Sequence, residues 1–256
     1  MSFDRLSLST VPITPLFDGL QLPEATGFIW RRHERFYLIT NWHVVSALDF
    51  FTKEHLLKGG PRPNKWRCHF VRVEQREREL IDVPIRDDND RPLWLIHFEQ
   101  ETRPIDVVAL PLDDEGLKTK VVSLFPVNEL APGKLAIMIG MDVFILGYPF
   151  GSKPPALPIW KRGSIASEPD LVRHSTGYYL VDTASRPGMS GSPVILRSWS
   201  NHILESNMWT TSNEQLPIDR IIGVYSGRLR PTDAQIGIVW HVDYIEQIID
   251  GGRRDT

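Results

Sequence analysis

The sequence predicts an all-β fold of many short strands that ends in one α-helix. Twenty prolines and eighteen glycines divide the 256 residues into short segments, and those segments are rich in β-branched and aromatic residues. Many short strands between frequent turn signals favour a barrel or a sandwich. Apolar residues recur at helical spacing with clarity only near the end, at Val242, Ile245, Ile248 and Ile249.

The expected elements follow from the same pattern along the chain. A short helix is expected after His43, and the final helix begins near Asp243. Pro132 and Gly133 stop regular structure, so we expect the chain to cross there between an N-terminal half, residues 1–130, and a C-terminal half, residues 131–256. Strands are expected at 36–40, 66–73, 93–98, 107–110, 143–148, 178–181, 194–196, 221–225 and 236–240.

Three short motifs carry the residues with the clearest chemical potential. Ser190 lies between glycines in 186–194, a pattern that turns the backbone sharply and brings amide N–H groups near the hydroxyl. His43 lies in Thr-Asn-Trp-His-Val-Val, at the end of an expected strand. Asp106 opens the apolar run Asp-Val-Val-Ala-Leu. Taken singly, each of the three residues more often has a structural role than a catalytic one.

Together, in the order His, Asp, Ser, these motifs resemble those of trypsin-like serine peptidases, in the bacterial, HtrA-like branch. The resemblance implies two packed antiparallel six-stranded β-barrels, chymotrypsin-like, with a C-terminal helix and without a PDZ domain. Further matches to the family pattern occur at 26–28, 144–149, 163–165, 181–184, 222–227 and 237–239. Segments 50–103 and 197–219 match nothing in that pattern.

The resemblance also implies a role for each residue of the triad. His43 is the expected general base, Asp106 orients its imidazole, and Ser190 is the expected nucleophile. The backbone N–H groups of Gly188 and Ser190 form the expected oxyanion hole. Asp113 and Asp114 are weaker rivals for the acid, because they lie in a polar stretch that is typical of a loop.

The substrate pocket is also expected from the resemblance. Ala184, six residues before the nucleophile, is the expected base of the S1 pocket, where the lack of a carboxylate disfavours lysine and arginine and leaves a small or medium apolar residue. Tyr225, Ser226, Gly227 and Ile238 are the expected lining of the cleft. For Tyr225 and Ile238, packing in a barrel is an equal alternative.

Two departures from the family pattern concern neighbours of the triad. Trp42 precedes His43 where alanine is commoner, which predicts different packing behind the histidine. Met189 replaces the aspartate that secreted relatives use to receive a freed N-terminus, so activation by that ion pair is not expected. Arg186 either contacts substrate or reaches solvent, and the sequence does not choose between these.

Bulk properties exclude several other classes of function. A net charge of −3 gives no basic surface for nucleic acid, and no apolar run is long enough for a membrane span. The histidines do not follow a zinc-binding pattern, and neither a metal nor another cofactor is expected. Cys68 is the only cysteine, and the N-terminal residues lack the pattern of a signal peptide, so we expect a cytoplasmic protein.

The expected activity is therefore serine endopeptidase activity on protein or peptide substrates. One alternative is a binding or scaffold protein that keeps the protease fold without turnover. A second is a protease that is silent until a regulatory partner binds, with 50–103 and 197–219 as the expected contact segments. A third is an esterase that uses the same site.

Overall fold

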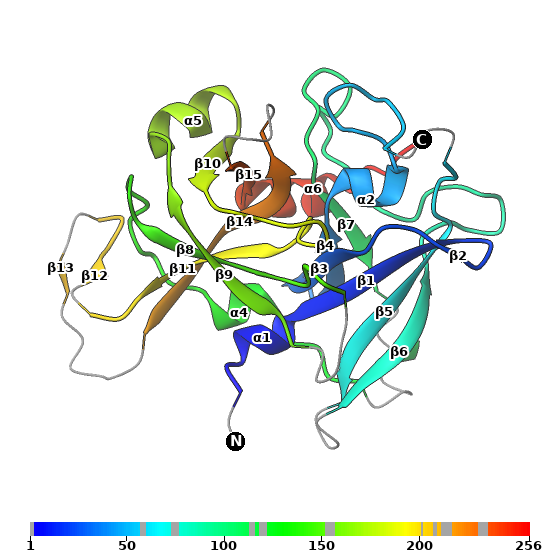
Figure 1. The fold of residues 1–256 in the computed structure, drawn as a ribbon, viewed down its shortest axis with the longest axis horizontal. Coiled ribbons are helices and arrows are strands. Elements are labelled where there is room, and N and C mark those ends of the chain that lie inside the picture. The colour runs from blue at the N-terminus through cyan, green and yellow to red at the C-terminus, as the bar shows by residue number, and fades with distance from the viewer. Residues whose placement is uncertain are drawn as a thin grey trace.

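A computed structural model describes residues 3–56, 60–72, 77–112, 116–117, 122–151, 157–200, 202–206, 209–210, 217–229 and 235–256. The architecture is all-β, as predicted, with two β-sheet units and a C-terminal helix (Figure 1). Asp113 and Asp114 lie outside the described residues.

The N-terminal half is built on a seven-stranded antiparallel sheet with the order β6-β5-β1-β3-β4-β7, and β2 pairs with β1. Beyond β6, the N–H of Leu93 donates to the Ile85 carbonyl, and Leu95 exchanges two backbone hydrogen bonds with Ala109 of β7. An irregular segment thus links the two ends of this sheet. The strands are β1 (Thr10–Phe17), β2 (Leu20–Gln21), β3 (Ala25–Arg32), β4 (Arg35–Thr40), β5 (Lys65–Arg72), β6 (Glu77–Pro84) and β7 (Val108–Pro111).

The C-terminal half is a closed six-stranded barrel with the order β10-β15-β14-β11-β8-β9. It matches the barrel that the family resemblance implies for this half. A separate two-stranded hairpin joins β12 to β13. The strands are β8 (Asp142–Gly147), β9 (Ile159–Ile165), β10 (Tyr178–Asp182), β11 (Pro193–Ser198), β12 (His202–Ile203), β13 (Trp209–Thr210), β14 (Ile218–Arg228) and β15 (Ile236–His241).

The described helices are short and lie at the ends and junctions of the sheets. The last, α6, begins at Asp243 as predicted and ends at Gly251, and the next residue, Gly252, has a φ of +59° that suits a left-handed C-cap. One face of α6 is buried, and from there the chain returns to the N-terminal half, so the C-terminus lies near α2 (Figure 1). The helices are α1 (Leu6–Ser9), α2 (Trp42–Ser46), α4 (Val127–Leu130), α5 (Pro169–Ser175) and α6 (Asp243–Gly251).

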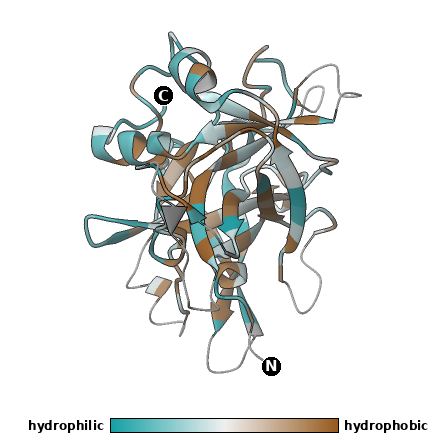
Figure 2. Cartoon of the chain, turned by 90° about the vertical axis from the view of Figure 1, so that its left-hand side faces the viewer, coloured by the Kyte–Doolittle hydropathy of each residue, from teal (hydrophilic) through white to brown (hydrophobic). Residues whose placement is uncertain are grey.

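Two hydrophobic clusters form the core. One fills the interior of the C-terminal barrel, and a larger one extends from the N-terminal sheet to α6 and to one side of the barrel. Figure 2 shows hydrophobic residues concentrated in the central strands, with hydrophilic residues on outlying loops and helices. This packing places the end of β4, at Thr40, beside Gly191 in the loop that precedes β11.

Segment 50–103 is largely part of the fold, because it supplies β5 and β6. The strand predicted at 93–98 is wrong: only Leu95 bridges to β7, and the chain turns at once, with the N–H of Gln100 donating to the carbonyl of His97. The division between residues 130 and 131 stays a prediction, although α4 and the following loop do lie between β7 and β8.

Candidate active site

His43 and Asp106 are joined by two hydrogen bonds. β4 ends at Thr40 and α2 follows, which brings His43 over the start of the segment that leads into β7. Its Nδ1 lies 2.7 Å from Oδ2 of Asp106, and its backbone N–H donates to Oδ1 over 2.9 Å. Because a carboxylate only accepts, Nδ1 carries the proton and Nε2 is left as a proton acceptor.

The Asp106 carboxylate is completely buried, yet it is fully supplied with donors. Besides the two bonds from His43, the Ser226 hydroxyl donates to Oδ2. The side-chain amide of Asn41 donates to the Asp106 backbone carbonyl over 2.7 Å. A buried charge is tolerated only with such partners, so this arrangement fixes the position of the carboxylate.

The environment of His43 sets its protonation. Burial lowers the pKa of His43, but the charge and hydrogen bond of Asp106 outweigh burial, so the pKa is raised above its ordinary value of 6.5. Asp49 adds a smaller effect in the same direction. The pair therefore favours an imidazolium once a proton arrives on Nε2.

The loop that carries Ser190 is shaped by two glycines in left-handed conformations. Gly188 has a φ of +93°, and a Cβ there would lie 2.4 Å from the carbonyl oxygen of Tyr148. Gly191 has a φ of +83°, and a Cβ there would collide with the backbone of Thr26. Only glycine fits both positions without displacing the neighbouring backbone.

Thr26, at the start of β3, holds this loop from the N-terminal half. Its N–H donates to the Ser190 carbonyl and its hydroxyl donates to the Gly188 carbonyl, each over 2.8 Å. The amide N–H groups of Gly188 and Ser190 themselves donate to no described residue. Two donors are thus left beside the Ser190 side chain.

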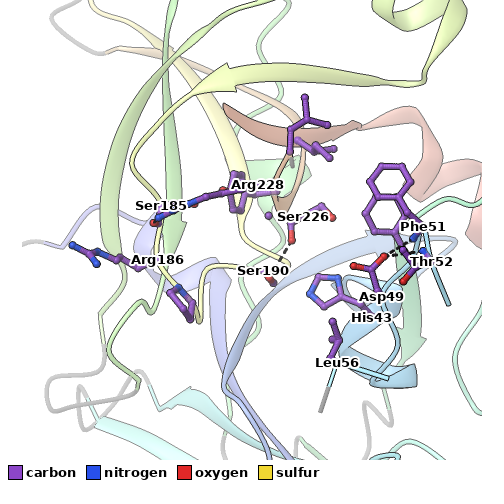
Figure 3. Close-up of a pocket in the computed structure, with 16 residues that line it drawn as sticks. His43, Asp49, Phe51, Thr52, Leu56, Ser185, Arg186, Ser190, Ser226 and Arg228 are labelled. Carbon is purple, nitrogen blue, oxygen red and sulfur yellow. Dashed lines mark hydrogen bonds between the residues drawn. The ribbon is translucent and has the colours of Figure 1, made fainter. Parts of the chain in front are cut away.

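The hydroxyl of Ser190 donates to the backbone carbonyl of Ser226 over 3.1 Å (Figure 3). Between Ser190 and His43, the described part of the chain contains no hydrogen bond, although both residues line the same cleft. The structure therefore brings all three motif residues together but joins only His43 and Asp106 directly.

That cleft has a volume of about 790 Å³ and contains most of the residues expected to bind substrate. Tyr225, Ser226, Gly227 and Ile238 line it together with His43 and Ser190. Ala184 is exposed and lies outside the lining, where Ser185 occurs instead. The role of Ala184 in the pocket stays a prediction.

Several lining residues were not expected from the sequence. The loop after α2 contributes Asp49, Phe50, Phe51 and Thr52, and the other side contributes Arg228, among others. The contact of Ser226 with Asp106 was also missed. In the sequence, the only sign of this contact is that the polar Ser226 directly follows the apolar strand 221–225. This does not reveal that its partner lies 120 positions away.

Among the described residues, no group of three or more His, Cys, Asp or Glu side chains is placed to hold a metal ion. None of the helices in the described part of the chain is long and apolar enough to cross a membrane.

Residues 25–200 match the family model for the trypsin-like peptidase domain. Among curated protein sequences, none matches this one. Among solved structures, the active form of the Rv3671c protease from M. tuberculosis is 16% identical with a TM-score of 0.51, and the match covers 98% of this chain and 83% of that one.

Two further solved structures show the same likeness. The serine endoprotease from Yersinia pestis is 14% identical with a TM-score of 0.51, covering 99% of this chain and 68% of that one. The tobacco etch virus protease, solved in an inactive form with substrate, is 10% identical with a TM-score of 0.54, covering 100% and 88%. At these identities the solved structures show a common fold, and the family match confirms the resemblance drawn from the three motifs.

Proposed function

Since the chain belongs to the trypsin-like peptidase family of hydrolases, we propose that it is a serine endopeptidase whose triad is Ser190, His43 and Asp106. One observation carries this proposal. His43 is held by the buried Asp106 carboxylate in the tautomer that leaves Nε2 free, in the cleft that also contains the Ser190 hydroxyl. Such an imidazole is oriented to act as a general base.

In the proposed reaction, Ser190 Oγ attacks the carbonyl carbon of the substrate while His43 Nε2 takes the hydroxyl proton. The N–H groups of Gly188 and Ser190 bind the oxyanion of the tetrahedral intermediate. His43 then gives its proton to the leaving amine, and an acyl-enzyme ester remains on Ser190. Water attacks this ester with His43 again as base, which releases the acid and restores the serine.

A second candidate is the same protease held inactive until a partner binds. The observation that favours it is the hydrogen bond from the Ser190 hydroxyl to the Ser226 carbonyl, which competes with a bond to His43. A rotation about one side-chain bond redirects the hydroxyl. Segments 50–103 and 197–219 are the proposed partner contacts, and exposed Trp199 in the second segment offers an apolar side chain there.

We also propose that the protein acts in the cytoplasm. The chain contains a single cysteine, Cys68, which is completely buried in β5, and burial raises the pKa of its thiol. One buried thiol cannot form a disulfide within the chain, and proteins without disulfides are usual in reducing compartments. Fractionation of cells that express the tagged full chain tests this proposal, and recovery from a secreted or periplasmic fraction contradicts it.

Labelling with a fluorophosphonate probe tests the proposed nucleophile directly. We expect the wild-type protein to be labelled on Ser190 and the Ser190→Ala and His43→Ala variants to remain unlabelled. Ser192→Ala is the matched control, because this neighbouring hydroxyl is buried and has no described hydrogen-bond partner. Labelling that appears only after a cell extract is added supports the regulated form, and labelling of Ser190→Ala contradicts the proposal.

A further inference from the structure

One side of the cleft contains a group of hydrogen-bond donors, and the two arginines among them form no ion pair with a described carboxylate. Ser185, Arg186 and Arg228 lie on the far side of Ser190 from His43 and its following loop (Figure 3). All three line the cleft. We call these three residues the donor subsite.

The donor subsite is organised around the Ser185 hydroxyl. This oxygen accepts from the phenol of Tyr225 and from Nε of Arg228, the latter over 3.4 Å. Arg228 also donates to the Ser185 carbonyl through Nη2. Because the Ser185 hydroxyl accepts twice and donates to no described residue, its own proton is left for a ligand. Three of the five guanidinium N–H groups are likewise uncommitted in the described structure.

The charge of the donor subsite is not balanced by a neighbouring carboxylate in the described residues. Arg197 of the same half, in contrast, forms ion pairs with both Asp4 and Asp219. Neither Arg186 nor Arg228 has such a pair with any described residue. Asp49, on the opposite side of the cleft, uses Oδ1 to accept from two backbone N–H groups of its own loop.

The donor subsite lies where a substrate residue next to the cleaved bond would be placed. β11 pairs with β14 only as far as Val224, so residues 226–228 have no described strand on the side away from β15. An extended peptide binds such an edge by adding a strand. The Ser190 hydroxyl already reaches the Ser226 carbonyl on this edge, and Arg228, two residues further along it, lines the same cleft.

We propose that the donor subsite selects a glutamate or aspartate as the residue that supplies the attacked carbonyl. This inference rests on the proposed endopeptidase function and replaces the small apolar residue that the sequence suggested. Arg228 and Ser185 donate to the substrate carboxylate, and Arg186 adds positive charge at the exposed rim. Lysine and arginine are rejected by charge, and glutamine loses the charge-assisted part of the hydrogen bonds.

The experiment compares two peptidyl diphenyl phosphonates that differ only in glutamate or glutamine at the position next to the phosphorus. These compounds phosphonylate the nucleophilic serine, with phenol as the leaving group, so peptide turnover is not needed. We expect the glutamate compound to react with the wild-type protein roughly 10-fold to 100-fold faster, the range of one charge-assisted hydrogen bond.

Variants assign the preference to its residues. Arg228→Gln is expected to bring the two rates close together, and Arg228→Lys to keep part of the difference because the charge remains. Arg186→Gln is expected to reduce the preference less. Arg162→Gln is the control, since this arginine pairs with Asp142 on the surface, away from the cleft lining, and the preference should be unchanged. Equal labelling of all variants by the simple fluorophosphonate shows that they are folded.

The outcomes separate the two proposals. Faster reaction of the glutamine compound, or equal rates with the wild type, overturns the acidic preference while labelling by the fluorophosphonate keeps the endopeptidase proposal. A preference that persists in Arg228→Gln overturns the assignment to the donor subsite. No labelling of Ser190 by any of the three compounds, with or without added cell extract, overturns the proposed function and the inference that rests on it.

Discussion

The active-site polar groups of the two halves differ in whether they have hydrogen-bond partners in the described structure. In the N-terminal half, the Asp106 carboxylate is completely buried and receives hydrogen bonds from His43 and from Ser226, so its charge is matched in the resting protein. In the C-terminal half, the N–H groups of Gly188 and Ser190 have no described acceptor. A charge that is always present must be satisfied at all times. Donors for a charge that forms only during reaction must stay free.

The contact between the halves is reciprocal. Thr26 of the N-terminal sheet holds two carbonyl groups of the Ser190 loop, while Ser226 of the C-terminal barrel completes the shell of Asp106. Each half thus fixes the part that the other half presents. Substitutions on the two sides should therefore differ in what they change, and four predictions test this comparison.

The largest effect is expected from Asp106→Asn. An amide offers His43 a donor where it needs an acceptor, so kcat should fall by roughly 10⁴-fold, as is typical of this change in a Ser-His-Asp triad. Activity rises with pH as His43 loses its proton. Without the carboxylate, only the weaker effect of Asp49 opposes the lowering of the His43 pKa by burial, so the midpoint of the kcat/KM profile should move to lower pH.

Asp49→Asn is the comparison for this pH shift. Asp49 is the weaker of the two carboxylates that raise the pKa of His43, so its removal should move the midpoint less and in the same direction. An unchanged midpoint in Asp106→Asn shows that the carboxylate does not control the titration of His43.

Gly188→Ala tests the opposite half. The new Cβ collides with the Tyr148 carbonyl at a φ of +93°, so the loop must shift and its free N–H groups lose their alignment. The expected loss in kcat is roughly 10²-fold to 10³-fold, the effect of one missing oxyanion donor, with the pH midpoint unchanged. Gly140→Ala is the control, because Gly140 also has a positive φ but its Cβ meets nothing within 4 Å.

The measurement for both glycine variants is peptide cleavage together with urea unfolding. Gly140→Ala should lose stability through backbone strain without a specific loss of kcat. Equal kcat values for the two variants indicate that strain alone, and not the position of the N–H groups, explains the result for Gly188.

His43, Asp106 and Ser190 could be singled out because each lies in a short motif and the three motifs, in this order, resemble those of trypsin-like serine peptidases; their catalytic roles stay predictions. Five of the six strands of the C-terminal barrel were also expected, since turn residues bound them in the sequence, whereas β9 of that barrel and β1, β3 and β6 of the N-terminal sheet were not. Contacts between distant segments were not accessible. Ser226 reaches Asp106 only because the pairing of β14 with β15 shifts between Tyr225 and Gly227, and no local pattern announces that shift.

The donor subsite was likewise not predictable from the sequence, because it depends on a contact between distant segments. The sequence suggested Ala184 as the base of the pocket, by counting back from the nucleophile. In the structure, the neighbouring Ser185 lines the cleft and contacts Arg228, which is 43 positions away. Ser185 and Arg228 give this part of the cleft a polar lining, and only the three-dimensional arrangement reveals the arginine.

Thr26→Ala is expected to have a smaller effect on catalysis. It removes the hydroxyl that donates to the Gly188 carbonyl and accepts from the N–H of Tyr148, but the backbone bond to Ser190 remains. We expect kcat to fall about 10-fold, in line with the loss of one to two net hydrogen bonds, and KM to change little. Thr26→Ser should restore kcat, because the hydroxyl is the required group. A rise in KM without a fall in kcat contradicts a positioning role.

The smallest effect on activity, and the clearest effect on stability, is expected from Asp255→Ala. Oδ2 of Asp255 accepts from the indole N–H groups of both Trp42 and Trp94, at 2.9 Å and 3.0 Å, which explains the tryptophan before His43. Trp94 is 1% exposed, so its N–H loses its only described acceptor in the variant. We expect the free energy of unfolding to fall by about 2 kcal/mol in urea titration.

Two control variants test whether this loss of stability comes from the buried hydrogen bonds of Asp255. Asp255→Asn keeps an acceptor oxygen and should lose much less stability. Asp250→Ala removes an exposed carboxylate that pairs with Arg32, which also should cost less, because solvent replaces surface partners. If Asp255→Ala unfolds like the wild type, the Asp255 carboxylate does not stabilise the half that carries His43. The backbone hydrogen bonds that join Arg253 to Ile96 and Asp255 to Trp94 are then the contacts of the C-terminal segment that remain to be tested.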